Sequence, residues 1–514
     1  MNPARAVLCA GFGRAESLLD RAFGSDSNPL HNLGALGFLF LWVVLISGIY
    51  LYIFFDTSVT GAYSSVEELT HGQWYLGGVM RSLHRYASDG LVLAMLLHLL
   101  REFSLDRYRG PRWFSWLTGL PILLFVYAAG VTGYWLVWDQ LAQYIAIASS
   151  EWLDWLPIFG EPIARNFLTE TSLSDRFFTL LVFLHIAVPL FLLLVLWIHL
   201  QRVSRPVITP PRRLVIGSLI AMVALSLVKP ALSQGPVSMD LVPGTVRLDW
   251  FYLALYPLLD QWSAGAVWAL VGASTVLLMA LPWLPPLRLG APAAVDLSLC
   301  NGCTRCAEDC PYTAIIMRPR SDGRPFDEEA VVDTSLCTRC GICVAACPIT
   351  TPFRRVGALA TAIDRADDDV AILRDRTQRA AEAIAGKPAG RRILVFACAH
   401  GAGRRHGEAE GTVRVPCSGA VPPSFIDYAL SRGLADGVVI AGCAEGSCHN
   451  RHGQAWTEQR IAGTRDPHLR DRVPRDRLRM IWAAPREAGK LDRAIEQFGE
   501  TITQDADAKA AADD

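Results

Sequence analysis

Four histidines in two apolar stretches constrain this chain most. His84 and His98 lie in one stretch and His185 and His199 in another, and each pair is fourteen residues apart. Fourteen helical residues return a side chain to within roughly 40° of the same face, about 21 Å further along the axis. Two such helices facing each other would make two stacked bis-histidine sites, which suit haem irons held from both sides. For an antiparallel pair of helices, we expect His84 to face His199 and His98 to face His185.

Glycines with the same period support ligation of haem. A single histidine on an apolar helix is more often a hydrogen-bonded core residue than a ligand, but four at matched spacing favour ligands. Two further apolar stretches carry glycine pairs fourteen residues apart, at Gly34 and Gly48 and at Gly119 and Gly133. Because glycine has no side chain, a flat macrocycle can lie against the helix backbone there. Ordinary small-residue helix packing would explain either pair alone, and the shared period argues against it.

The region of about residues 30–285 resembles the cytochrome b family, the dihaem core of the bc1 and b6f complexes. The resemblance rests on Arg81-Ser-Leu-His84, on His98-Leu-Leu-Arg101, on the run from Gly133 to Gln140 and on His185-Ile-Ala-Val-Pro189. It implies two b haems. It also implies that Arg81 and Arg101 are partners of the haem propionates.

The chain departs from that family where the family binds quinones. In place of a Pro-Glu-Trp-Tyr motif at the outer quinol-oxidising site, it reads Leu248-Asp249-Trp250-Phe251-Tyr252. A carboxylate and aromatic side chains remain, so Asp249 and Tyr252 are the candidate quinol-binding residues. Near the inner quinone site Ser204 replaces the family's histidine, and Arg202 and Arg205 stand nearby.

Hydropathy predicts a membrane protein. The chain has 514 residues, 52% of them hydrophobic, and a net charge of −1 that gives no indication of nucleic-acid binding. Six stretches are long enough to cross a bilayer, at 32–55, 78–101, 113–137, 176–200, 213–230 and 263–284. Arginines cluster at 101–112 and 202–213, so the positive-inside rule predicts that both termini lie in the cytoplasm. We expect the membrane to be a bacterial inner membrane. Residues 1–30 lack the continuous apolar core of a cleavable signal.

A duplicated cysteine motif follows the last apolar stretch. All thirteen cysteines except Cys9, to which we assign no role, lie from residue 300 onward. Two runs have the Cys-x2-Cys-x2-Cys-x3-Cys-Pro spacing of bacterial ferredoxins, in which three thiolates cap a 4Fe-4S cube and the fourth is exchanged between repeats. We therefore assign one cluster to Cys300, Cys303, Cys306 and Cys347, and the other to Cys310, Cys337, Cys340 and Cys343. Zinc or disulfides are the alternative, which a reducing cytoplasm and the two Cys-Pro endings disfavour.

Short β runs alternating with helices begin at Arg391. Three of these runs lead to a cysteine, at Cys398, Cys417 and Cys443, and Cys448 follows. Because the carboxyl ends of parallel strands meet at one crevice of an open α/β sheet, the four thiols should converge there. A 2Fe-2S cluster is the expected occupant, and buried or redox-active free thiols are the alternative.

Residues 391–465 resemble the small iron-sulfur subunit that connects methanogen hydrogenases to heterodisulfide reductase. The matching segments are Cys417-Ser-Gly, Ala441-Gly-Cys443 and Ser447-Cys448-His449, whereas relatives often carry an additional cysteine near the segment Cys398-Ala-His400-Gly. The resemblance implies a soluble, flavin-containing partner of the heterodisulfide-reductase type. We expect His400 and His449 to tune this site without ligating it.

The expected architecture is multi-domain. It comprises an all-α transmembrane bundle (1–290), an α+β dicluster ferredoxin domain (291–355), a helical linker (356–390), an α/β open-sheet iron-sulfur domain (391–500) and a disordered tail (501–514). Together these parts predict an electron-transfer subunit of a quinone-linked oxidoreductase, in contact with lipid and quinone and part of a larger complex. The resemblance to cytochrome b implies that this complex is dimeric. Catalysis would need partner subunits, because the sequence contains no nucleophile–base constellation or nucleotide-binding glycine loop. The alternatives are an energy-coupled module, bifurcating or driving reverse electron flow, and a membrane anchor for soluble redox subunits.

Overall fold

The computed structural model describes residues 3–513 except 159–161, 164–167, 169–172, 204, 239, 241–244, 250–251, 286–289, 354–358 and 407–408. Ser204, Trp250 and Phe251 of the quinone motifs therefore lie outside the described residues. The chain divides into two compact units, which we describe separately. The helical unit comprises Ala15–Arg109 and Trp113–Leu284, and the cysteine-rich unit comprises Met1–Arg14, Gly110–Arg112 and Pro285–Asp514.

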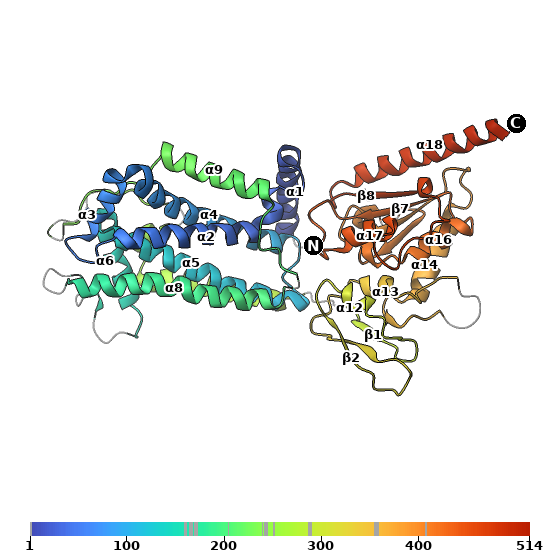
Figure 1. Cartoon of the computed structure of the whole chain (residues 1–514), viewed down its shortest axis with the longest axis horizontal. Helices are drawn as coiled ribbons and strands as arrows, with labels where there is room; N and C mark the ends of the chain where they lie inside the picture. Colours follow the sequence, from blue (N-terminus) through green and yellow to red (C-terminus); the bar gives the residue numbers. More distant parts are fainter. Residues whose placement is uncertain are drawn as a thin grey trace. The chain divides into compact units, whose positions relative to one another are not determined.

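Long apolar helices build the helical unit (Figure 1). After α1 (Pro3–Phe23), its helices are α2 (Leu33–Phe54), α3 (Ala62–Glu67), α4 (Val79–Ser104), α5 (Trp113–Val137), α6 (Gln140–Asp154), α8 (Asp175–Gln201), α9 (Arg212–Val228), α10 (Tyr256–Gln261) and α11 (Ala264–Ala280). Helix α2 packs along α4, and α5 packs along α8. Their shared core includes Leu41 of α2, Leu91 of α4, Val126 of α5 and Leu192 of α8.

A helix forms at each of the six stretches that hydropathy predicts to span the membrane. In the described part of the chain, four helical segments are long and apolar enough to cross a bilayer, namely Pro29–Phe54, Gly110–Val137, Phe178–Gln201 and Ala264–Trp283. Helix α4 carries Arg81, Arg85 and Asp89 in its first half, and α9 has 17 residues. Four of the six predicted stretches are thus candidate membrane spans by length and composition, and the crossing of α4 and α9 stays a prediction.

The ferredoxin part of the cysteine-rich unit contains two short antiparallel sheets. Strand β1 (Ala293–Val295) pairs with β4 (Ile363–Arg365), and β2 (Ile315–Pro319) pairs with β3 (Glu328–Val332). The short helices α12 (Arg305–Glu308) and α13 (Ile342–Ala346) complete it.

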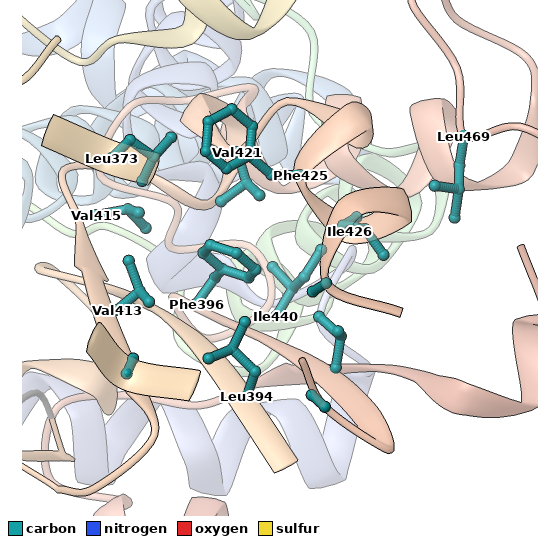
Figure 2. Packing of buried hydrophobic residues seen from close by; sticks show 14 of the residues in the cluster. Leu373, Leu394, Phe396, Val413, Val415, Val421, Phe425, Ile426, Ile440 and Leu469 are labelled. Carbon is teal, nitrogen blue, oxygen red and sulfur yellow. The ribbon is translucent and has the colours of Figure 1, made fainter. Parts of the chain in front are cut away.

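The C-terminal part is a four-stranded parallel sheet in the order β6-β5-β7-β8. Its strands are β5 (Ile393–Cys398), β6 (Thr412–Val415), β7 (Gly437–Gly442) and β8 (Leu478–Trp482), and its helices are α14 (Val370–Ile384), α15 (Gly403–His406), α16 (Pro423–Ser431), α17 (Gly453–Ala462) and α18 (Ala488–Asp513). Figure 2 shows Phe396 and Ile440 of the sheet against Phe425 of α16. The open α/β sheet predicted from the sequence is therefore present.

Two boundary predictions were wrong. The segment expected to be a helical linker contains β4, and its helix α14 buries Val370 and Leu373 in the core of the C-terminal part, because its apolar residues repeat at helical spacing. The tail expected to be disordered continues α18 as far as Asp513. Ile502 is buried there because it extends the apolar stripe of Leu491 and Phe498.

Candidate haem and iron-sulfur sites

The four histidines meet as two pairs, but not as the pairs predicted from the sequence. The rings of His84 and His185 face each other, with centroids 6.3 Å apart and planes at 57°. His98 lies close enough to His199 for the two imidazoles to interact electrostatically. The prediction assumed antiparallel helices. It was wrong because one long helix, α5, returns the chain between α4 and α8, so that α4 and α8 run in the same direction.

Hydroxyl groups hold three of the histidine rings. Ser47 Oγ lies 3.2 Å from His84 Nδ1, and His84 Nδ1 also lies 3.0 Å from the carbonyl oxygen of Val44. Thr132 Oγ1 lies 3.1 Å from His185 Nδ1, and Thr118 Oγ1 lies 2.9 Å from His199 Nδ1. The three hydroxyls lie on α2 and α5, the helices that carry the glycine pairs.

These contacts determine which ring nitrogen is free. Each hydroxyl donates its proton to a backbone carbonyl one turn earlier, as Thr132 does to Ala128 and Thr118 does to Phe114. The hydroxyl oxygen must therefore accept a hydrogen bond from Nδ1–H of the histidine. This tautomer leaves Nε2 with its lone pair, as ligation of a metal requires.

Each glycine of the two periodic pairs lies against one histidine. A Cβ atom on Gly48 would lie 3.0 Å from Cε1 of His84, and one on Gly133 would lie 3.0 Å from Cε1 of His185. The corresponding distances are 3.7 Å from Gly34 to His98 and 3.5 Å from Gly119 to His199. The structure thus provides side-chain-free backbone beside both histidine pairs, and these residues fit two haems, each between two imidazoles.

Arg101 also fits a haem propionate. It is buried, and its Nε donates to Glu16 Oε1 over 2.8 Å. Its Nη2 is buried without a hydrogen-bond partner among the described residues, a donor that an anionic carboxylate would satisfy. Arg81 differs, because the structure pairs it internally with Glu67 at 3.5 Å and with Ser233 Oγ at 2.9 Å.

Asp249 and Tyr252, the candidate quinol residues, come together with side chains of α4 and α5. Arg85 donates to Asp249 Oδ2, and Tyr134 OH donates to the same oxygen over 3.0 Å. The hydroxyls of Tyr252 and Ser88 lie 2.7 Å apart, and Arg85 pairs with Asp89 at 3.2 Å. We call these six residues the outer polar cluster: Arg85, Ser88, Asp89, Tyr134, Asp249 and Tyr252.

Eight ferredoxin thiols line two small cavities, four thiols in each. The cysteines of the first thiol group are Cys300, Cys303, Cys306 and Cys347. Those of the second thiol group are Cys310, Cys337, Cys340 and Cys343. The grouping, with the fourth cysteine exchanged between repeats, is the one that the sequence predicts.

The protein surroundings of these cysteines disfavour the charged thiolate form. Burial, followed by the charges of Cys303 and Cys347, raises the pKa of Cys306 to about 12, and burial raises that of Cys340 to about 11. Iron ions would supply the positive charge that a set of buried thiolates requires.

The C-terminal thiol site comprises Cys398, Cys417, Cys443 and Cys448. It lies at the carboxyl ends of β5 and β7, neighbouring strands between which the chain order reverses in the sheet, and such a switch point is where open sheets bind ligands. The sulfur atoms of Cys398 and Cys443 are 4.0 Å apart. Hydrogen bonds with Cys417 and Cys443 hold the pKa of Cys448 well below its usual value.

Two histidines stack beside the C-terminal thiol site. The rings of His400 and His449 lie 3.6 Å apart between centroids and are parallel to within 2°. Each lies within two residues of a thiol, Cys398 or Cys448. The site therefore offers four sulfur ligands and two neighbouring imidazoles, which fits an iron-sulfur cluster with flanking hydrogen-bond donors.

Comparison with known families confirms the resemblances expected from the sequence. Residues 19–205 match the model of cytochrome b/b6/petB, residues 299–351 match the 4Fe-4S dicluster domain, and residues 393–504 match the methyl-viologen-reducing hydrogenase delta subunit. The chain is thus a membrane electron-transfer protein that joins a cytochrome b region to iron-sulfur domains.

A chain named "Hyperthermophilic respiratory Complex III" aligns with 20% sequence identity and a TM-score of 0.41, covering 49% of this chain and 75% of that chain.

Several site residues were missed by reasoning from the sequence. Ser47, Thr118 and Thr132 each directly precede one of the periodic glycines, and this Ser/Thr-Gly pattern was a signal that could have found them. Arg85 directly follows His84, but no pattern in the sequence indicates its pairing with Asp249, which is 164 residues away.

Proposed function

We propose that this chain passes electrons between a soluble redox partner and membrane quinone, through its thiol sites and its two histidine pairs. The observation that carries the proposal is the arrangement of His84 with His185 and of His98 with His199, each histidine beside a glycine. Bound haems and clusters would supply reversible one-electron chemistry. The side chains orient the ligand nitrogens, exclude water and provide hydrogen bonds.

The outer polar cluster supports a quinol site near the pair of His84 and His185. Asp89 Oδ1 is buried without a hydrogen-bond partner among the described residues, and so is the hydroxyl of Tyr127. Tyr127 packs against Tyr252 with ring centroids 6.2 Å apart. Unsatisfied buried polar atoms are costly, so these two groups suit the ring oxygens of a quinone and the proton that quinol oxidation releases.

The C-terminal thiol site supports contact with a soluble partner. Its neighbours Glu445 and Gly446 are exposed, as is His400. We propose a flavoprotein of the heterodisulfide-reductase type, because residues 393–504 match a hydrogenase delta subunit. The topology that follows from the arginine clusters would put this site on the cytoplasmic side of a bacterial inner membrane.

Optical spectra of the purified full chain test the proposal. We expect two b-type haems in the reduced-minus-oxidised spectrum, and we expect added quinol to reduce at least one of them. Preparations without any haem would overturn the proposal and leave the membrane-anchor function. Copurified flavin, measured by its absorbance, would identify the partner class.

A further inference from the structure

The second thiol group shares a small core with the C-terminal thiol site. Ile342, two residues after Cys340, is fully buried together with Cys417, Ala420 and Trp456, and Cys340 packs against this core. The residues come from two parts of the chain that bind separate clusters in the proposed function. A core residue therefore connects the two sites directly.

Glycines bring the two backbones close. A Cβ on Gly453 would lie 2.3 Å from Cys417 Sγ, and 3.6 Å from both Cys448 Sγ and Cδ1 of Ile342. On the ferredoxin side, Gly341 has a φ of +75°, and a Cβ there would lie 3.1 Å from that of Ala420. Larger side chains at Gly341 and Gly453 would push the second thiol group and the C-terminal thiol site apart.

A buried ion pair fixes this contact. Asp309, the residue before Cys310, accepts hydrogen bonds from Arg460 and Arg465 of the C-terminal part. The side chains of Asp309 and Arg460 are 3% and 2% exposed, and Arg460 Nη1 also donates to the carbonyl oxygen of Gly419 over 2.9 Å. Because a buried pair holds its geometry through several hydrogen bonds, it fixes the position of the ferredoxin part relative to the C-terminal part.

The contacts beside the first thiol group are of another kind. Arg305 pairs with Asp466 over 2.8 Å, but these side chains are 35% and 52% exposed. Ser424 Oγ donates to the backbone oxygen of Thr350 over 2.9 Å. The core of the ferredoxin part includes thiols of both groups, Cys300 and Cys347 as well as Cys337 and Cys343, so the difference lies in the packing of Cys340 and Ile342 against Cys417.

We propose that the C-terminal thiol site exchanges electrons with the second thiol group and not with the first, across the contact of Ile342 with Cys417, and that Asp309 and Arg460 position the two sites. The inference rests on the proposed function, since it presumes a cluster at each site. One electron moves in each exchange. One cluster is oxidised as the other is reduced, and no bond forms or breaks.

Electron paramagnetic resonance of the full chain, reduced stepwise with dithionite, tests the proposal. We expect the spectrum of the C-terminal cluster to split or broaden when the cluster of the second thiol group becomes paramagnetic. The variant Cys340→Ser should abolish this interaction, and Cys303→Ser, in the first thiol group, should preserve it. An interaction that survives Cys340→Ser and vanishes in Cys303→Ser would overturn the proposal.

A second pair of variants avoids changing any ligand. Ile342→Ala should weaken the spin interaction and slow reduction of the second cluster after rapid mixing. Val344→Ala, on the same helix but in the ferredoxin core, should do neither. Equal effects of the two variants would contradict the proposal. Failure of the haems to accept electrons from the clusters, with the spin interaction intact, would instead overturn the proposed function alone.

Discussion

His84 and His185 face each other with ring centroids 6.3 Å apart, although they are 101 positions apart in the chain. We therefore propose that these two histidines hold one haem and that His98 and His199 hold the other. The two haems would then lie at two levels of the bundle, about 21 Å apart along the helices.

Paired substitutions test this assignment by haem content. The double variant His84→Ala/His185→Ala removes both ligands of a single haem, so one haem per chain should remain. The double variant His84→Ala/His199→Ala should remove a ligand from each site and deplete both haems. Pyridine haemochrome analysis measures the content. The opposite result for the two variants would support the antiparallel pairing.

The hydroxyl of Thr132 should tune one haem. Because its oxygen accepts a hydrogen bond from His185, it would make the imidazole a stronger donor to a bound ferric iron. Loss of a bond worth about 0.5–1.5 kcal/mol in Thr132→Val should raise the potential of that haem by roughly 20–60 mV. Redox titration measures both haems together, and the haem of His98 and His199 should keep its potential. Thr179→Val is the control, because Thr179 of α8 bonds a backbone carbonyl. An unchanged potential in Thr132→Val would argue against this role.

Alanine should be tolerated differently at two helical glycines. A Cβ at Gly133 would lie 3.0 Å from His185, whereas one at Gly272 of α11 meets nothing within 4 Å. Gly272→Ala should therefore keep both haems and stabilise its helix by up to about 1 kcal/mol. Gly133→Ala should lower haem retention during purification. Equal retention in the two variants would show that Gly133 is not part of a haem site.

The outer polar cluster should be needed for reaction with quinol and not for haem binding. Asp249→Asn removes the charge that faces Arg85, so quinol-driven haem reduction should slow at least tenfold while dithionite still reduces both haems. Asp260→Asn is the control, since Asp260 accepts a hydrogen bond from the hydroxyl of Tyr144 in the same unit. Stopped-flow absorbance follows the reaction. Full quinol activity in Asp249→Asn would exclude the cluster as the site.

The buried ion pair between Asp309 and Arg460 should dominate the stability of its contact. Asp309→Ala leaves a buried guanidinium without its carboxylate, at a cost of about 3–5 kcal/mol. Arg305→Ala breaks the exposed pair with Asp466 and should cost less than about 1 kcal/mol. Thermal loss of iron-sulfur absorbance in the full chain compares them. Similar midpoints for the two variants would contradict the difference in burial.

Local spacing made much of this protein predictable. Helix geometry predicts that histidines and glycines fourteen residues apart lie on one helix face. The two thiol groups were predictable because short loops place their cysteines within reach of one cluster. The parallel sheet was also expected, since its β runs are apolar and end at cysteines. The errors concerned the expected linker and the expected tail. In the linker, β4 pairs with the distant strand β1, and in the tail, Ile502 packs on one face of the C-terminal sheet.

The sequence by itself determined which residues stand at ligand spacing, because helix rise and loop length are local properties of the chain. Only the tertiary structure decided which of these residues face each other. The direction of α8 relative to α4 pairs His84 with His185, and folding across more than a hundred residues brings Arg85 to Asp249 and Arg460 to Asp309. Such partners are selected by burial and by packing between elements, and these are set by the whole fold.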